Sequence, residues 1–296
     1  MNERRNLKFL YGGATAILVG LITLPVSGER ILYLDASAPG EMSDTEGPFW
    51  LDHTANEYDL IATGDPIPVH VDNPGEAGDY WDFEQNSGFK GIGDDNLLDF
   101  ETDVEAGPGL GDPFSVNVYL NWGGPHQGDT PYIILTKADK KSGSSDFSGY
   151  SLNLSWDQPN SASLNIQGGD NQLRHYLRDN DPAGSLENRD AMITMTHDGS
   201  GSTDGTDIFV NGVSIVAPPY SFNESDLAGS TLNDDQLELG INDDNGNGTN
   251  NGMNADVYFV EIYDHALTVE EVVSRWNNGE PQRATVNPIR TSDSGF

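Results

Sequence analysis

The sequence predicts an all-β protein, an antiparallel two-sheet jelly-roll sandwich with one short helix near its C-terminus. Three observations favour this fold. Short runs of alternating apolar and polar residues recur along the chain, and clusters of Gly, Asn, Asp and Pro separate them. Only one segment has the periodicity and the end signals of a helix. The chain has 296 residues, and its hydrophobic content of 35% is enough for a packed core.

The N-terminal segment differs from the rest of the chain. Three basic residues precede an apolar run over 9–24, and the small residues Val26 and Gly28 occupy the positions that precede a cleavage site. This arrangement predicts a signal peptide over residues 1–28. The run is short for a membrane span, although an uncleaved N-terminal anchor is the alternative. The sequence therefore predicts an exported protein, either secreted or held at the cell surface.

Ten segments after residue 28 have the alternation of half-buried strands. They are 31–34, 114–122, 132–137, 151–156, 163–167, 172–178, 191–197, 207–210, 236–239 and 257–263. Asn211 and Gly212 follow one of these runs, and this dipeptide is typical of a two-residue hairpin turn with positive φ at both positions. We expect one domain over 29–279, followed by a polar tail over 280–296.

One helix is expected over 268–277. Thr268 is its N-cap, Glu271 completes a capping box three residues later, and Gly279 follows the end. The helix should place an apolar stripe over one end of the sandwich. The stripe residues are Leu267, Val269, Val272 and Trp276.

Five stretches of sequence carry a family resemblance. In order they are 79–83 with 86–88, 112–120, 148–152, 196–199 with 207–212, and 257–268 with 270–272. Together they resemble the laminin G-like group of the concanavalin A-like lectin/glucanase superfamily. The resemblance implies a jelly roll of two antiparallel sheets. It leaves the function open, because this fold serves lectins, adhesion modules, glycosidases and lyases.

Charge and composition exclude several classes of function. The chain has 48 Asp+Glu against 14 Lys+Arg, a formal net charge of -34, so a phosphate backbone would be repelled and no nucleic-acid partner is expected. The absence of cysteine excludes disulfides and thiol nucleophiles. No strand carries the closely spaced carboxylates that related glucanases use, which makes catalysis the lesser interpretation.

Strand alternation predicts a polar surface made by several strands. The residues sent away from the apolar side are Asn117, Tyr119, Asn153, Asn165, Gln167, Arg174, Tyr176 and Arg178. We expect them to line one concave surface that binds a glycan, since amides and guanidinium groups bind sugar hydroxyls or carboxylates and Tyr rings stack on sugars. The two Arg residues favour an anionic polysaccharide. The alternative is an ordinary solvated sheet face.

Calcium is the expected cofactor. Asp243, Asn245 and Asn247 satisfy the first half of a D-x-[DN]-x-[DN]-G loop, but Asn254 stands where a bidentate Glu belongs. The family resemblance adds Asp256, because such domains often hold a structural calcium near the closing strand. In so acidic a chain a chance match is the alternative interpretation.

Three classes of function follow from these observations. The leading one is a secreted, non-catalytic carbohydrate-binding or adhesion module. The second is a polysaccharide-degrading enzyme of the same fold. The third is a structural protein of an extracellular layer or filament, which would associate with copies of itself.

Overall fold

The computed structural model describes residues 28–38, 48–72, 78–84, 87–92, 95–101, 111–123, 132–140, 147–154, 162–168, 171–176, 186, 188–202, 205–214, 231–241 and 252–277. Several of the predicted features lie outside these ranges. They are the signal peptide up to residue 27, the tail over 280–296, Arg178, and the loop residues Asp243, Asn245 and Asn247.

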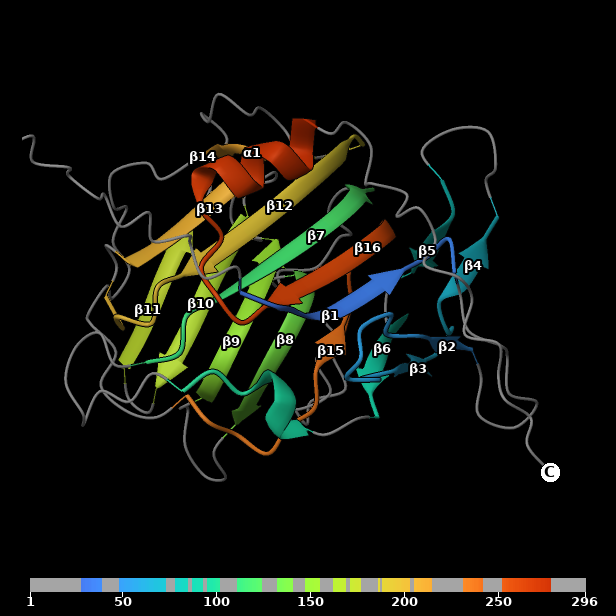
Figure 1. Ribbon diagram of the computed structural model, residues 1–296. Helices are drawn as coiled ribbons and strands as arrows, with labels where there is room; N and C mark the ends of the chain where they lie inside the picture. The colour runs from blue at the N-terminus through green and yellow to red at the C-terminus, as the bar shows by residue number, and fades with distance from the viewer. Residues whose placement is uncertain are drawn as a thin grey trace, which may run out of the picture.

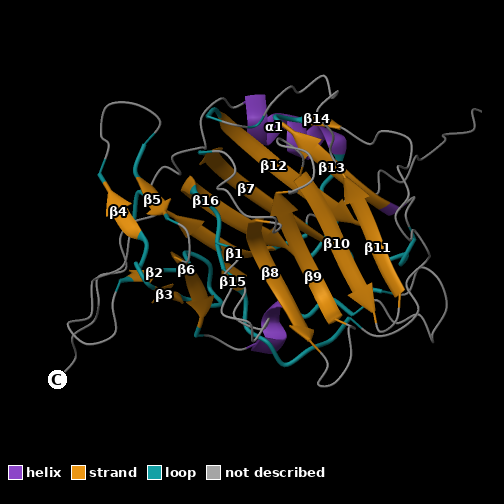
Figure 2. Cartoon of the chain, turned by 180° about the vertical axis from the view of Figure 1, so that it is seen from behind, coloured by secondary structure: helices purple, strands orange, loops and turns teal. Residues whose placement is uncertain are grey.

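The strands form two sheets, one in front of the other in Figure 1 and seen from behind in Figure 2. The front sheet has the order β14 (Val213–Ser214), β13 (Thr206–Val210), β12 (Asp190–His197), β7 (Phe114–Trp122), β16 (Ala255–Tyr263), β5 (Tyr80–Phe83) and β4 (Val69–Val71), with β1 (Arg30–Asp35) also paired to β16. The back sheet has the order β11 (Asn171–Tyr176), β10 (Ala162–Gly168), β9 (Phe147–Leu154), β8 (Tyr132–Lys140), β15 (Glu238–Leu239), β6 (Ser87–Gly91), β3 (Leu60–Gly64) and β2 (Phe49–Trp50).

Every pairing between these strands is antiparallel. The predicted fold class, an antiparallel two-sheet sandwich with one short helix, is therefore confirmed.

The core lies between the two sheets and follows the predicted alternation. Val116, Val118 and Leu120 of β7 are fully buried, as are Leu152 and Leu154 of β9. Burying a side chain of this size contributes about 1.5–3 kcal/mol, so these alternating positions are a major source of the sandwich's stability.

The helix α1 (Val269–Asn277) lies on the outer face of the front sheet (Figure 1). Its capping box is present as predicted: Thr268 N donates to Glu271 Oε2 at 2.8 Å, and Glu271 N donates to Thr268 Oγ1 at 3.3 Å. Leu267 and Val272 are buried in a second hydrophobic cluster, and Trp276 packs against it. Val269 is 53% exposed, so its assignment to the apolar stripe is wrong.

The second hydrophobic cluster joins the helix to the sheet. Its buried members are Tyr33, Met192, Phe209, Tyr258, Phe259, Tyr263, Leu267 and Val272. The helix thus covers a sheet face, not one end of the sandwich as expected. An outer sheet face with so many aromatic residues needs such a cover to exclude water.

The predicted hairpin turn is confirmed. Asn211 and Gly212 have φ values of 53° and 77°, and they join β13 to β14. The Asn211 side chain also accepts a hydrogen bond from Met192 N at 2.9 Å, which ties the turn to β12.

Within the described residues, no helix is long and apolar enough to cross a membrane.

Candidate functional site

The two sheets divide the predicted ligand surface. Asn117 and Tyr119 belong to β7 in the front sheet, whereas Asn153, Asn165, Gln167, Arg174 and Tyr176 belong to β9, β10 and β11 in the back sheet. The outer faces of two stacked sheets point in opposite directions. The expectation of one surface containing all these residues is therefore wrong. Alternation indicates the side of a strand, but not the sheet to which the strand belongs.

Asn117 is a structural residue under the helix. It is 0% exposed, its Nδ2 donates to Glu261 Oε2 at 2.8 Å, and its Oδ1 accepts from Thr194 Oγ1 at 2.9 Å. A side chain whose donor and acceptor are both engaged in this way cannot contact a ligand. Its expected role in ligand binding is therefore wrong, because the helix covers this part of the face.

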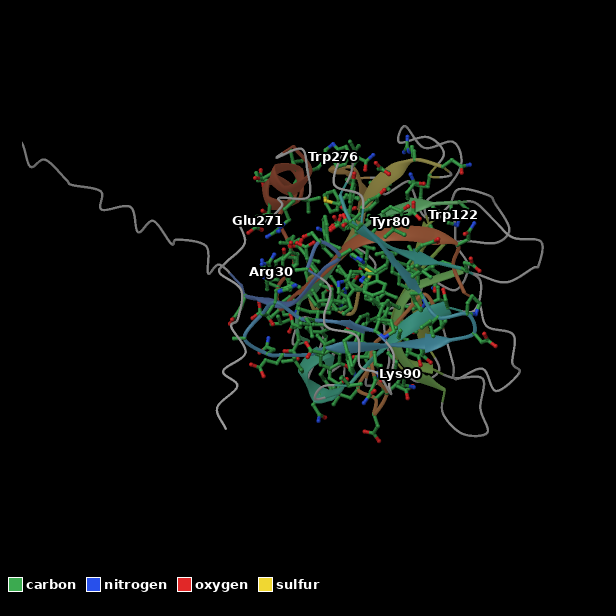
Figure 3. The ribbon with its side chains drawn as sticks, turned by 90° about the vertical axis from the view of Figure 1, so that its right-hand side faces the viewer. Arg30, Tyr80, Lys90, Trp122, Glu271 and Trp276 are labelled. Atoms are coloured by element: carbon green, nitrogen blue, oxygen red, sulfur yellow. The ribbon has the colours of Figure 1, made fainter. Side chains whose placement is uncertain are left out.

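Glu261 is the centre of that covered network. Its carboxylate accepts from Arg30 at 2.7 Å and from Arg275 of the helix at 3.1 Å, in addition to Asn117. The Arg275 guanidinium also lies over the Tyr263 ring, 4.6 Å from its centroid. Figure 3 shows Arg30 on the same side of the molecule as the helix residues Glu271 and Trp276. One buried carboxylate thus connects β1, β7, β16 and α1.

Tyr119 lies farther along β7, where it joins a group of aromatic rings. Its ring centroid is 4.8 Å from that of Tyr258 and 5.6 Å from that of Phe259, and Tyr258 is 5.8 Å from Tyr80. A β-bulge in β16 between Val257 and Phe259 allows both Tyr258 and Phe259 to join the outer cluster.

A row of polar residues crosses the front sheet beside these rings. The row has one residue on each of four neighbouring strands, and each residue is paired in register with the next. In order they are Asp82 of β5, Asp256 of β16, Asn121 of β7 and Asp190 of β12. Asn121 Nδ2 donates to Asp190 Oδ1 at 2.8 Å, and Tyr258 Oη donates to the same oxygen at 3.2 Å.

We call this group the acidic–aromatic patch, and we define it by its rings and its polar row. Its members are Tyr80, Asp82, Tyr119, Asn121, Asp190, Asp256 and Tyr258. All of them except Tyr258 are partly exposed.

Burial and mutual repulsion perturb the acids of the patch. Burial, together with the charges of Asp82 and Asp190, raises the pKa of Asp256 to about 6. Burial and then the charge of Glu84 raise the pKa of Asp82. Burial and Asp190 raise the pKa of Tyr119 to about 12. The patch therefore offers carboxyl, amide and phenol groups in an acidic environment of reduced polarity.

The back-sheet members of the predicted surface are placed by strand register. Asn165 is opposite Ser151 on one side and Arg174 on the other, and Tyr176 is opposite Ser163. Asn153 is 5% exposed, and its Nδ2 donates to Ser151 Oγ at 2.9 Å. These positions share the back sheet, and their role in ligand binding stays a prediction.

Asp256 is the only predicted calcium ligand among the described residues. In that part of the chain, no group of three or more His, Asp or Glu side chains is arranged to hold a metal ion. The calcium prediction therefore depends on the loop over 243–247, which precedes β16.

Sequence reasoning did not identify the patch. The signal was present in the closing strand, where Asp256 and Tyr258 alternate with apolar residues, and in the Tyr80–Asp82 pair. Finding it required the order of β5, β16, β7 and β12, which only the structure provides.

Comparison with known proteins identifies the fold. No protein-family model matches the chain, and no curated protein matches it. Solved structures do match over 84% of the chain, and the chain spans about half the length of each.

Three of these structures illustrate the match. One is a structure of botulinum neurotoxin type C, whose cell entry is described as dependent upon interaction with two ganglioside molecules. It has a TM-score of 0.52 and 15% identity, with 51% of that chain covered. The binding domain of Paraclostridial Mosquitocidal Protein 1 has a TM-score of 0.56 and 14% identity, with 52% covered. The binding domain of botulinum neurotoxin DC in complex with rat synaptotagmin II has a TM-score of 0.53 and 12% identity, with 51% covered. At these identities the chain shares their β-sandwich fold.

Proposed function

We propose that this protein is an exported, non-catalytic glycan-binding module whose ligand lies on the acidic–aromatic patch. The observation that carries the proposal is the adjacency of the rings and the polar row on one partly exposed sheet face. Tyr rings can stack on the apolar faces of sugars, while carboxylates and amides hydrogen-bond the hydroxyl groups.

The charge of the patch indicates the class of glycan. Asp82, Asp190 and Asp256 would repel an anionic polymer, while a neutral sugar can donate its hydroxyl protons to them. A neutral glycan therefore fits this surface better than the anionic polysaccharide that Arg174 and Arg178 suggested. An anionic ligand would have to bind elsewhere, for which the back sheet around Arg174 is the predicted place.

Two further observations support a binding function. The sequence resembles the laminin G-like group, which includes lectins and adhesion modules. One structure of the same fold is described with ganglioside interaction, and gangliosides carry sugar head groups. The predicted signal peptide over 1–28 would deliver the single domain over 29–279 to the cell surface or the medium.

Hydrolysis is the second candidate, and one observation favours it. Asp82 and Asp256 are opposite each other in register, and the pKa of each is raised. Glycosidases use two carboxyl groups, one of them protonated, on either side of the scissile bond.

Affinity electrophoresis through gels that contain a neutral or an anionic polysaccharide tests the proposal. We expect a neutral glycan to retard the wild type, and Tyr80→Ala to weaken binding about fivefold through loss of about 1 kcal/mol of ring contact. Tyr176→Ala on the back sheet is the matched control and should bind as the wild type.

Three other results of these experiments would contradict the proposal. Retardation by no glycan would refute the proposal, and weakening by Tyr176→Ala alone would move the site to the back sheet. Release of reducing ends from the retarding glycan, lost in Asp256→Asn, would establish the enzyme in place of the binding module.

A further inference from the structure

Three segments that are distant in sequence meet near one end of the back sheet. Lys137 belongs to β8, Asp99 follows the 3-10 helix η1 (Asp95–Leu98), and Asn233 lies before β15. The Lys137 side chain is 0% exposed and that of Asp99 is 9% exposed. Lys137 Nζ donates to Asp99 Oδ1 and, at 3.4 Å, to Asn233 Oδ1. In Figure 1, η1 lies at the lower ends of β8 and β9.

Several hydrogen bonds hold Asn233 against the lysine. Asn233 Nδ2 donates to Lys137 O and to Thr231 O, each at 3.3 Å. Asn233 Oδ1 accepts from Asp235 N at 3.0 Å. Thr231 Oγ1 in turn donates to Phe100 O at 2.5 Å, which ties this segment to the residue that follows Asp99. The carboxamide is thus oriented on both its oxygen and its nitrogen.

Buried aromatic residues lie beside the group, since Tyr150 is opposite Lys137 in register and Phe100 follows Asp99 in the chain. The rings of Phe100 and Phe114 are stacked at 4.5 Å, and Tyr150 is 4.9 Å from Phe114. Tyr150 Oη donates to Leu98 O at 3.2 Å, so this ring also holds the end of η1. A lysine–carboxylate pair buried in such surroundings carries a large desolvation cost, which an uncharged covalent link would remove.

We propose that Lys137 and Asn233 are joined by an amide bond between Nζ and Cγ. Asp99 accepts a proton from the Lys137 ammonium, and the neutral amine attacks Cγ of Asn233. Negative charge then develops on Asn233 Oδ1, where the Asp235 N–H donates, as in an oxyanion hole. Asp99 keeps that proton, and the second proton that the Lys137 nitrogen loses passes to Nδ2.

The reaction is balanced without any co-reactant. The Nζ–Cγ bond forms, the Cγ–Nδ2 bond breaks, and one neutral ammonia leaves, whose third hydrogen is the second proton that the nitrogen of Lys137 loses. Asp99 ends as a neutral carboxylic acid, so the link leaves no charge in this buried group. The chain has no cysteine and so cannot form a disulfide, whereas this bond would link residues 96 positions apart in sequence.

The mass of the intact, denatured full-length protein tests the proposal directly. We expect the wild type to be lighter than the encoded chain by one ammonia, once its N-terminus is identified. Tandem mass spectrometry of a tryptic digest should then find a branched peptide that joins Lys137 to Asn233, with no cleavage after Lys137. On a denaturing gel the linked chain should migrate faster than its unlinked variants.

Variants separate the three roles. Lys137→Arg, which removes the nucleophile, and Asp99→Asn, which removes the proton carrier, should both have their encoded masses. Asn233→Asp should become linked with loss of one water. Lys90→Arg is the matched control, because Lys90 pairs with Glu238 at 3.1 Å on neighbouring strands, and it should still lose one ammonia.

The wild-type result decides the matter even if a variant fails to fold. An encoded mass in the wild type would overturn the proposal. Loss of one water, with Asp99 in the branched peptide, would overturn the assignment to Asn233. Loss of ammonia located to an unbranched asparagine peptide would show a succinimide, and would equally overturn it.

Discussion

Replacing Glu261 by Gln should destabilise the protein by about 2 kcal/mol. The substitution keeps the shape of the side chain and one carbonyl acceptor, but it removes the charge that Arg30 and Arg275 contact. Hydrogen bonds to a charged group contribute about 1.5–3 kcal/mol each. The two Arg side chains are 35% and 36% exposed, so water replaces part of what they lose, and the sum is discounted accordingly.

Glu261→Ala should cost more, about 3–5 kcal/mol. This substitution also leaves Asn117 Nδ2 without its acceptor, and Asn117 is fully buried. Removing one partner from a buried charged network has costs of about this size. The difference between the two variants therefore combines the lost acceptor of Asn117 with the lost packing of the buried side chain.

Urea unfolding at neutral pH, followed by the fluorescence of the buried tryptophans, is the appropriate assay, because guanidinium would screen the charges. Glu270→Gln is the matched control, since Glu270 is exposed on the same helix and should change stability by less than about 0.5 kcal/mol. Equal stabilities for Glu261→Gln and Glu270→Gln would refute the reasoning. Hydrogen exchange should also show faster opening of α1 in Glu261→Gln than in the control.

Three other predictions concern the cap, the turn and the cation. Burial acts to raise the pKa of Glu271, but the hydrogen bonds from Thr268 outweigh it and lower that pKa. The capping box therefore stabilises the fold at pH values above the ordinary pKa of the carboxyl, and this stabilisation is lost as the pH falls through the pKa of the folded state. Glu271→Gln should therefore destabilise the protein at neutral pH, and this effect should shrink as the pH falls below the ordinary pKa of the carboxyl; an effect on urea unfolding that does not change with pH would contradict this. Gly212→Ala should cost about 1–2 kcal/mol in the same assay, because φ is +77° and a Cβ would lie 3.2 Å from Trp276; an unchanged stability would contradict the strain. The melting temperature should be higher in calcium than in magnesium, and higher than in EDTA with NaCl at matched ionic strength. Asp256→Asn should reduce this rise. Equal melting temperatures in all three solutions would contradict the calcium prediction.

Much of the fold follows from local sequence rules. The apolar alternation of β7 and β9 identified core residues, Asn211–Gly212 identified a turn, and Thr268 identified the start of the helix. These features depend on neighbours in sequence, so the sequence is sufficient to predict them. Strands β2 and β4 were missed because they have only two and three residues, and β3 and β6 were missed because their apolar and polar residues do not alternate.

The candidate site was less predictable because it depends on contacts distant in sequence. Asn117 points away from the core as expected, yet it is fully buried, since α1 returns to cover it from about 150 residues later in the chain. The bulge in β16 changes the alternation at Tyr258 and Phe259, and no local pattern marks it. Strand order then separates Asn117 from Asn165 and brings Asp82 beside Asp256.

The second hydrophobic cluster couples the helix to the acidic–aromatic patch. Tyr258 belongs to both, and Tyr119 packs against the cluster while its partly exposed side chain belongs to the patch. If a glycan orders these rings, it should tighten the docking of α1, and coupling between two sites is reciprocal. Glu261→Gln, which loosens α1 without touching the patch, should therefore weaken glycan binding by up to about fivefold, equivalent to about 1 kcal/mol. Titration calorimetry with the neutral glycan that retards the wild type measures this, with Glu270→Gln as control. An unchanged Kd in a folded Glu261→Gln protein would show that the helix and the patch are independent.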